Sequence, residues 1–127
     1  MAVDLKKCNP SPRIEEDGTL YIYEGDTACI DIEIELYRIC EEKAVEIIVP
    51  FQQNDKVRIC FKENLTKRKV YEFEFSNIQN NTVTLCISKE ITKLFKKGVY
   101  TYCVHIDTFY EDEGTKTISY ENRMVVE

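Results

Sequence analysis

Apolar and polar residues alternate along most of this chain, and the alternation predicts β-strands. In the clearest segment, residues 28–36, five apolar residues alternate with one cysteine and three carboxylates. Such period-two alternation is typical of a strand that buries one face against a core and leaves the other face wet. Further strands are predicted at 20–23, 44–49, 57–62, 70–75, 82–87, 99–108 and, as a strand pair or one bent strand, 116–126.

One segment, residues 88–97, has the helical period instead. Ser88 is a predicted N-cap, because its hydroxyl can accept a hydrogen bond from a free backbone N–H. Gly98 fits the position just after a helix end, and three apolar residues between them have the spacing of one helix face. A helix of this length is not stable alone in water, so we expect it to pack on the sheets.

These elements predict an all-β fold, an immunoglobulin-like β-sandwich of seven or eight strands with one short helix. We expect residues 1–18 to form an N-terminal arm, since Pro10 and Pro12 block regular structure, and residues 19–127 to form the sandwich domain. A true immunoglobulin domain has a tyrosine two residues before a core cysteine and a core tryptophan. Here Tyr102 is adjacent to Cys103 and there is no Trp, so only the architecture is expected.

The inward faces of two strands are predicted most clearly by the alternation. They consist of Val57, Ile59 and Phe61 in one strand and Val83, Leu85 and Ile87 in the other. We place the second set on a central strand, so truncating its leucine should leave a cavity in the core.

Composition narrows the choice of partners. The chain has 127 residues, enough for one domain with its own core, and 43% of them are apolar. Its net charge of -6 disfavours a nucleic-acid partner, since binding a phosphate backbone needs clustered cations. No apolar run has the length of a signal peptide or a membrane span, so we expect synthesis in the cytoplasm and no membrane partner.

Six cysteines stand at positions 8, 29, 40, 60, 86 and 103. Because no signal sequence is visible, we expect them to be reduced. No Cys-x-x-Cys occurs and the smallest gap is eleven residues, so we expect no zinc site and no other metal or cofactor.

The side chains that carry catalysis are sparse. His105 is the only histidine and lies in the middle of a predicted strand without a partner motif, so we interpret it as a strand residue. The acidic clusters Glu15-Glu16-Asp17 and Glu111-Asp112-Glu113 do not match a calcium loop and are expected to be solvated turns. The basic patch Lys67-Arg68-Lys69 is short, and the isolated glycines form no phosphate loop. We therefore expect no enzyme and no catalytic residues.

Four cysteines are predicted to point away from the most apolar strand faces, although free cysteine is usually buried. One interpretation is a second, thinner core layer or simple compositional drift. The other is that these faces are contact surfaces covered in an assembly. The residues that we expect to contact other proteins are Glu15, Glu16, Asp17, Cys29, Cys60, Cys86 and Cys103.

Several motifs in a fixed order, within residues 19–127, resemble the N-terminal domain family of phage baseplate upper proteins and related tail or fibre modules. A Gly-Asp turn precedes an isoleucine-rich strand, and a Thr-Val-Thr-Leu strand leads into a capped helix that ends before a glycine. A Gly-x-Tyr-x-Tyr strand and an Asn-Arg-x-x-Val segment follow. The motifs are Glu24-Gly25-Asp26-Thr27, Asp55-Lys56-Val57-Arg58-Ile59, Thr82-Val83-Thr84-Leu85, Leu94 to Gly98, Gly98 to Tyr102, and Asn122-Arg123-Met124-Val125-Val126.

This resemblance implies a structural or assembly protein of a phage tail, baseplate or phage-like particle that binds neighbouring particle proteins. It implies several copies in a symmetric assembly, located in the bacterial cytoplasm and then in the virion or phage-like particle. Such modules often precede a receptor-binding region, and this sequence stops at Glu127, so a connector, decoration or accessory role is expected. The alternative is a small phage-encoded inhibitor that blocks a host protein, with its acidic charge mimicking nucleic acid.

Overall fold

A computed structural model describes residues 12–34, 36–40, 45–49, 51–110 and 114–127 of the chain. The prediction of an all-β, sandwich-like fold with one short helix is confirmed, while its immunoglobulin-like detail stays a prediction. The elements are β1 (Arg13–Ile14), β2 (Leu20–Ile22), β3 (Ala28–Glu33), β4 (Leu36–Cys40), β5 (Val45–Val49), β6 (Lys56–Glu63), β7 (Lys69–Ser76), β8 (Thr82–Ile87), α1 (Lys89–Thr92), β9 (Gly98–Tyr110) and β10 (Gly114–Val126).

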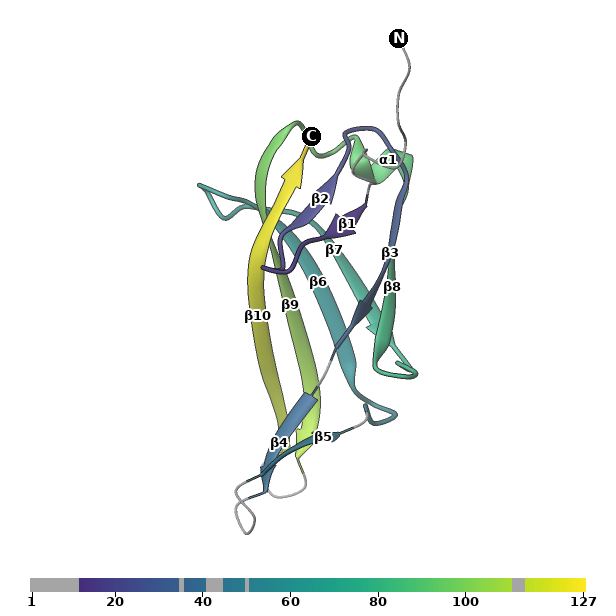
Figure 1. The fold of residues 1–127 in the computed structure, drawn as a ribbon, viewed down its shortest axis with the longest axis vertical. Helices are drawn as coiled ribbons and strands as arrows, with labels where there is room; N and C mark the ends of the chain where they lie inside the picture. The colour runs from purple at the N-terminus through teal and green to yellow at the C-terminus, as the bar shows by residue number, and fades with distance from the viewer. Residues whose placement is uncertain (1–11, 35, 41–44, 50, 111–113) are drawn as a thin grey trace.

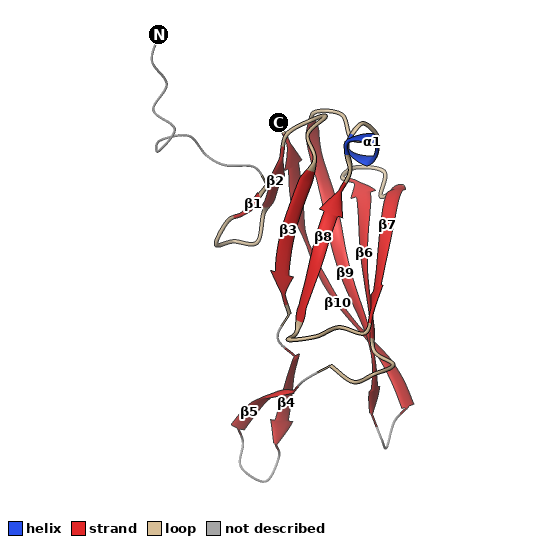
Figure 2. Cartoon of the chain, turned by 90° about the vertical axis from the view of Figure 1, so that its right-hand side faces the viewer, coloured by secondary structure: helices blue, strands red, loops and turns tan. Residues whose placement is uncertain are grey.

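Two layers of very different width make up the sandwich. The wide layer is a six-stranded sheet in the order β1-β2-β10-β9-β6-β7, in which only the β2–β10 pair is parallel. The narrow layer is the antiparallel pair β3–β8, which lies in front of the wide sheet in Figure 2. A third pair, β4–β5, extends from the end of the molecule away from the C-terminus (Figure 1).

The core lies between the two layers, as the alternation predicts. Val57, Ile59 and Phe61 are completely buried in β6, and the inward set of β8 is at most 3% exposed. The Phe61 ring meets the Phe95 ring edge to face, with 5.4 Å between their centroids. Both predicted inward sets are therefore confirmed.

The helix is shorter than the sequence predicts. Ser88 caps α1 as expected, since its Oγ accepts a hydrogen bond from the backbone N–H of Ile91 at 3.3 Å. The helix then ends at Thr92, because Phe95 inserts into the core. Its ring packs edge to face on the Tyr100 ring, with 5.2 Å between the ring centroids. The Tyr100 hydroxyl also bonds both backbone polar groups of Lys96, which gives the chain after the helix a tertiary anchor.

Candidate functional site

The narrow sheet leaves part of the wide sheet uncovered. On β10, Ile118 and Tyr120 lie opposite Ile106 and Val104 of β9, so all four side chains share the inner face. Ile106 and Val104 are buried, whereas Ile118 is 39% exposed and Tyr120 is 50% exposed. The sandwich therefore shows an apolar strip on what is otherwise its core face.

A cavity of about 350 Å³ lies beside this strip and opens along β3. We call it the β3 groove. One wall comes from the inward side chains at the end of β3, the other from β9 and β10, and the β1–β2 segment closes one end. Its lining residues are Ile14, Gly18, Asp31, Ile32, Glu33, Ile34, Tyr102, Val104, Ile106 and Tyr120.

Hydrogen bonds fix the closed end of the β3 groove. The Tyr102 hydroxyl donates to the backbone carbonyl of Gly18, and Asn122 Nδ2 donates to the carbonyl of Asp17 at 2.8 Å. Gly18 has φ of +89°, and a Cβ there would collide with the side chains of Asn122 and Tyr120, so glycine is required. Burial, followed by the neighbouring Tyr120, raises the pKa of Tyr102, which keeps its hydroxyl a neutral donor.

The open side of the groove is a strand edge. Within the described chain, β3 pairs only with β8. The N–H of Ile34 donates to the carbonyl of Asn81 at 2.7 Å and so extends this ladder by one residue. Because backbone groups alternate in direction along a strand, the N–H and C=O groups of Cys29, Asp31 and Glu33 point away from β8. These groups form the free edge.

The rim of the free edge is acidic. Asp31 and Glu33 are exposed on the outer face of β3, and the residues opposite them on β8 are Thr84 and Thr82. Asp31 accepts a hydrogen bond from the Thr84 hydroxyl at 2.7 Å. Neither carboxylate forms an ion pair with a cation in the described segments.

The acidic residues predicted to make contacts lie in the turn between β1 and β2. Glu15, Glu16 and Asp17 are all exposed, and Glu15 pairs with Arg13 at 3.0 Å. Asp17 precedes Gly18 at the closed end of the groove, and its carboxylate accepts the backbone N–H of Thr19 at 2.9 Å. This bond holds the pKa of Asp17 below its usual value. The structure therefore places Asp17 next to Gly18 at the closed end of the β3 groove, although Asp17 itself does not line it.

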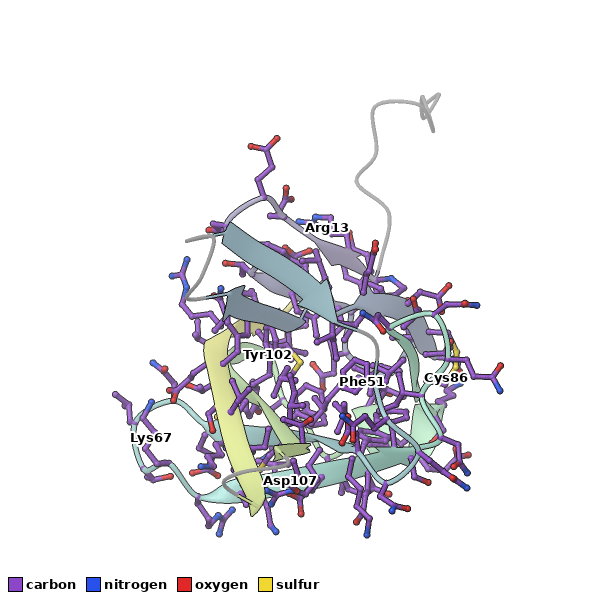
Figure 3. The ribbon with its side chains drawn as sticks, turned by 90° about the horizontal axis from the view of Figure 1, so that it is seen from below. Arg13, Phe51, Lys67, Cys86, Tyr102 and Asp107 are labelled. Atoms are coloured by element: carbon purple, nitrogen blue, oxygen red, sulfur yellow. A yellow bond between two sulfur atoms is a disulfide. The ribbon has the colours of Figure 1, made fainter. Side chains whose placement is uncertain are left out.

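The four outward cysteines form two cross-strand pairs. Cys29 and Cys86 face each other across β3 and β8, with their Cα atoms 4.0 Å apart, and they form a disulfide. Figure 3 shows this bond at the periphery of the molecule, next to Cys86. The expectation that all cysteines are reduced was wrong for this pair. It rested on the absence of a visible signal sequence, whereas the fold places these two thiols directly opposite each other.

Cys60 and Cys103 are also directly opposite each other, on β6 and β9, and both are free. They lie on the outer face of the wide sheet, yet they are only 3% and 4% exposed. Burial raises the pKa of both thiols, with Glu72 beside Cys60 and Glu121 beside Cys103 adding to the effect. Of the two interpretations of the outward cysteines, a thin second buried layer fits this pair. Contact with a partner there would require the covering side chains to move.

His105 belongs to a polar network on the same outer face. Its Nδ1 lies 2.8 Å from Ser119 Oγ, and Asp107 accepts from Thr117 at 2.6 Å and pairs with Arg58 at 3.3 Å. Thr117 and Arg58, not the histidine, bond the aspartate. The backbone N–H groups of paired central strands are engaged in the sheet ladder, so these strands offer no spare donors to stabilise an oxyanion. We therefore interpret the cluster as surface hydrogen bonding.

The remaining sequence candidates carry no ligand-binding arrangement in the segments that the structure describes. The basic patch is neutralised by ion pairs: Lys67 pairs with Glu121, Arg68 with Glu63, and Lys69 with Glu72. Glu111, Asp112 and Glu113 lie outside the described residues. Within the described chain no three metal-ligating side chains come together, and no helix has the length and apolarity of a membrane span.

Comparisons with protein-family models, with curated proteins and with solved structures find no match to this chain. The resemblance to phage baseplate modules therefore stays a prediction that rests on the sequence motifs.

The β3 groove is not predicted by the sequence. Ile14 and Gly18 fall within the predicted arm, and the other lining residues occur in the sequence only as ordinary members of alternating strands. One local signal does exist, since Ile118 and Tyr120 alternate with polar residues in the predicted strand 116–126 and so share one face. Using that signal requires the strand order, which alternation does not give.

Proposed function

We propose that this protein is a structural or assembly component of a phage tail, baseplate or phage-like particle and that it binds a neighbouring particle protein through the β3 groove. The observation that carries the proposal is the apolar strip of Ile118 and Tyr120 exposed beside a free strand edge. Contiguous apolar surface next to unpaired backbone is the kind of surface that soluble proteins use for protein contacts. The phage context comes from the motif resemblance.

Protein binding suits the groove better than catalysis. Its walls are mainly aliphatic and aromatic, and its two carboxylates, Asp31 and Glu33, sit on the outer rim. His105 is on the opposite face of β9 from Tyr102, Val104 and Ile106, because side chains alternate along a strand. An active site would need convergent polar groups inside the cavity.

A second candidate function is the inhibitor that binds a host protein. The observation that favours it is the net charge of -6 together with the acidic rim of the groove, which forms no ion pair in the described segments. Both candidates use the same surface, so the identity of the bound protein separates them.

The test is incorporation into particles. A phage or prophage lacking the gene is complemented with the wild-type protein, with Ile118→Lys, or with Val99→Lys, and copies per purified particle are counted by mass spectrometry. Val99 is the matched control, since it is a strand residue of similar exposure, 44% against 39%, on the opposite sheet face. We expect many copies of the wild type and of Val99→Lys, and few of Ile118→Lys. Absence of the wild type from particles, with one host protein copurifying instead, would replace the proposal by the inhibitor hypothesis.

A further inference from the structure

We propose that the β3 groove binds an extended segment of the partner protein, which adds to β3 as a third strand of the narrow sheet. Apolar side chains at alternate positions of this segment fill the groove, and Lys or Arg side chains between them face Asp31 and Glu33. The inference rests on the proposed function, because it specifies the chemistry of the protein that docks there.

Unpaired backbone groups along β3 can form hydrogen bonds with an added strand. The N–H and C=O groups of Cys29, Asp31 and Glu33 point away from β8, and no other strand of the described chain pairs with them. An extended peptide satisfies such a row of groups with its own main chain, which is how strand addition gains affinity without depending on sequence. The disulfide at Cys29 ties β3 to β8, so the edge is held in place.

The groove next to β3 offers space for apolar side chains of the added strand. A strand placed against the free edge of β3 extends over the groove that the end of β3 forms with β9 and β10, next to Tyr120, which is exposed and lines the groove. Every second side chain of that strand then points into the cavity of about 350 Å³. The free edge of β8 offers no such space, because its inward side chains, Val83, Leu85 and Ile87, are already covered.

The carboxylates of Asp31 and Glu33 favour a partner segment with cationic side chains. The outward side chains of the added strand stand directly opposite Asp31 and Glu33, and opposite charges in such cross-strand positions attract. On β8, the residues directly opposite these carboxylates are threonines, which carry no charge. A second copy that docked β3 against β3 would bring carboxylates together, so the rim disfavours this symmetric pairing and favours a cationic segment.

The experiment uses the wild-type protein and soluble synthetic peptides in which Val alternates with Lys or with Glu. We expect the Val–Lys peptide to bind more tightly than the Val–Glu peptide by at least roughly 2- to 30-fold, the factor that two opposite-charge cross-strand pairs give over neutral pairs, since the like charges of the Val–Glu peptide also repel. Methylating the backbone nitrogens that face β3 should abolish binding. In hydrogen exchange, the amides of Cys29, Asp31 and Glu33 should become protected when the Val–Lys peptide is bound.

Charge reversal provides the matched variants. In Asp31→Lys with Glu33→Lys the preference should switch to the Val–Glu peptide, whereas Asp26→Lys with Glu90→Lys changes net charge equally and should keep the Val–Lys preference. The control carboxylates are exposed and lie outside β3. Equal binding of both peptides, or binding that survives backbone methylation, overturns the inference.

The outcomes distinguish failure of strand addition at β3 from failure of the proposed function. If neither peptide binds but particle incorporation still depends on Ile118, the apolar strip beside the groove is an interface and strand addition is wrong. If the protein forms a dimer that competes with the Val–Lys peptide, a second copy is the occupant and the cationic partner is wrong.

Discussion

Leu85 is the residue that tests the packing of the narrow sheet on the wide one. Its side chain is completely buried in the middle of β8, opposite Ile30 of β3. It belongs to the same cluster as the inward residues of β6 and β9. If the faces are assigned correctly, Leu85→Ala leaves a cavity between the layers.

The magnitude follows from the carbons removed. Leu→Ala deletes three carbon atoms, and at about 0.8 kcal/mol for each the transfer term is roughly 2.4 kcal/mol. A cavity term adds to this, so buried leucines lose about 2–5 kcal/mol in total. The adjacent Cys86 is bonded to Cys29, which limits how far β8 can move to fill the space. We therefore expect a loss of about 3–4 kcal/mol, within the range for such sites.

The measurement is urea unfolding of the oxidised protein, with the slope m compared between variants so that a shift in midpoint reports stability. Thr84→Ser is the control in the same strand, because Thr84 is exposed and serine keeps a hydroxyl for Asp31. We expect the control to change the free energy of unfolding by less than about 0.5 kcal/mol. If Leu85→Ala shifts the midpoint no more than the control, the inner face of β8 is assigned wrongly.

The further predictions concern the disulfide and Tyr102. Intact mass without reductant should be lower than the reduced mass by at least two hydrogens, about 2 Da, and an unchanged mass would contradict the pairing of Cys29 with Cys86. Replacing both cysteines by serine should cost up to about 4 kcal/mol in urea unfolding, from the entropy of a loop with a separation of 57 residues. Tyr102→Phe should cost about 1 kcal/mol, because the Gly18 carbonyl loses its donor. Since the pKa of Tyr102 is raised, the stability that it contributes is present below the ordinary tyrosine pKa of about 10 and is lost as pH rises above it. The decline should be shallower in Tyr102→Phe, and an equal decline in both proteins would exclude Tyr102 as its source.

Alternation predicts most of the strands and the inward faces of β6 and β8 because these depend on local pattern, although β3 ends at Glu33 and β4 (Leu36–Cys40) is not predicted. The inward sets of β6 and β8 follow from a period of two residues that any strand buried on one face must show. β1 cannot be predicted in this way, since two residues carry no period. The helix is overestimated because capping and spacing are local signals, whereas its end is set by the tertiary contacts of Phe95.

The candidate site depends on which strands are neighbours, and the sequence pattern does not contain that information. Cys29 and Cys86 are 57 residues apart in the chain, and only the register of β3 on β8 makes them partners. Cys60 and Cys103 look equally outward in sequence, yet both are buried on the outer face of the wide sheet. The groove likewise arises because a two-stranded layer faces a six-stranded one.

The disulfide between β3 and β8 also determines how the domain would carry mechanical load. A strand docked along β3 and pulled along its axis loads the ladder in shear, and the force passes from β3 to β8. In the oxidised protein a covalent bond near the start of β3 shares this force with the hydrogen bonds, so β3 cannot be peeled away from its partner. In the reduced protein the short ladder bears the force alone, so tension should detach the narrow layer earlier than in the oxidised protein.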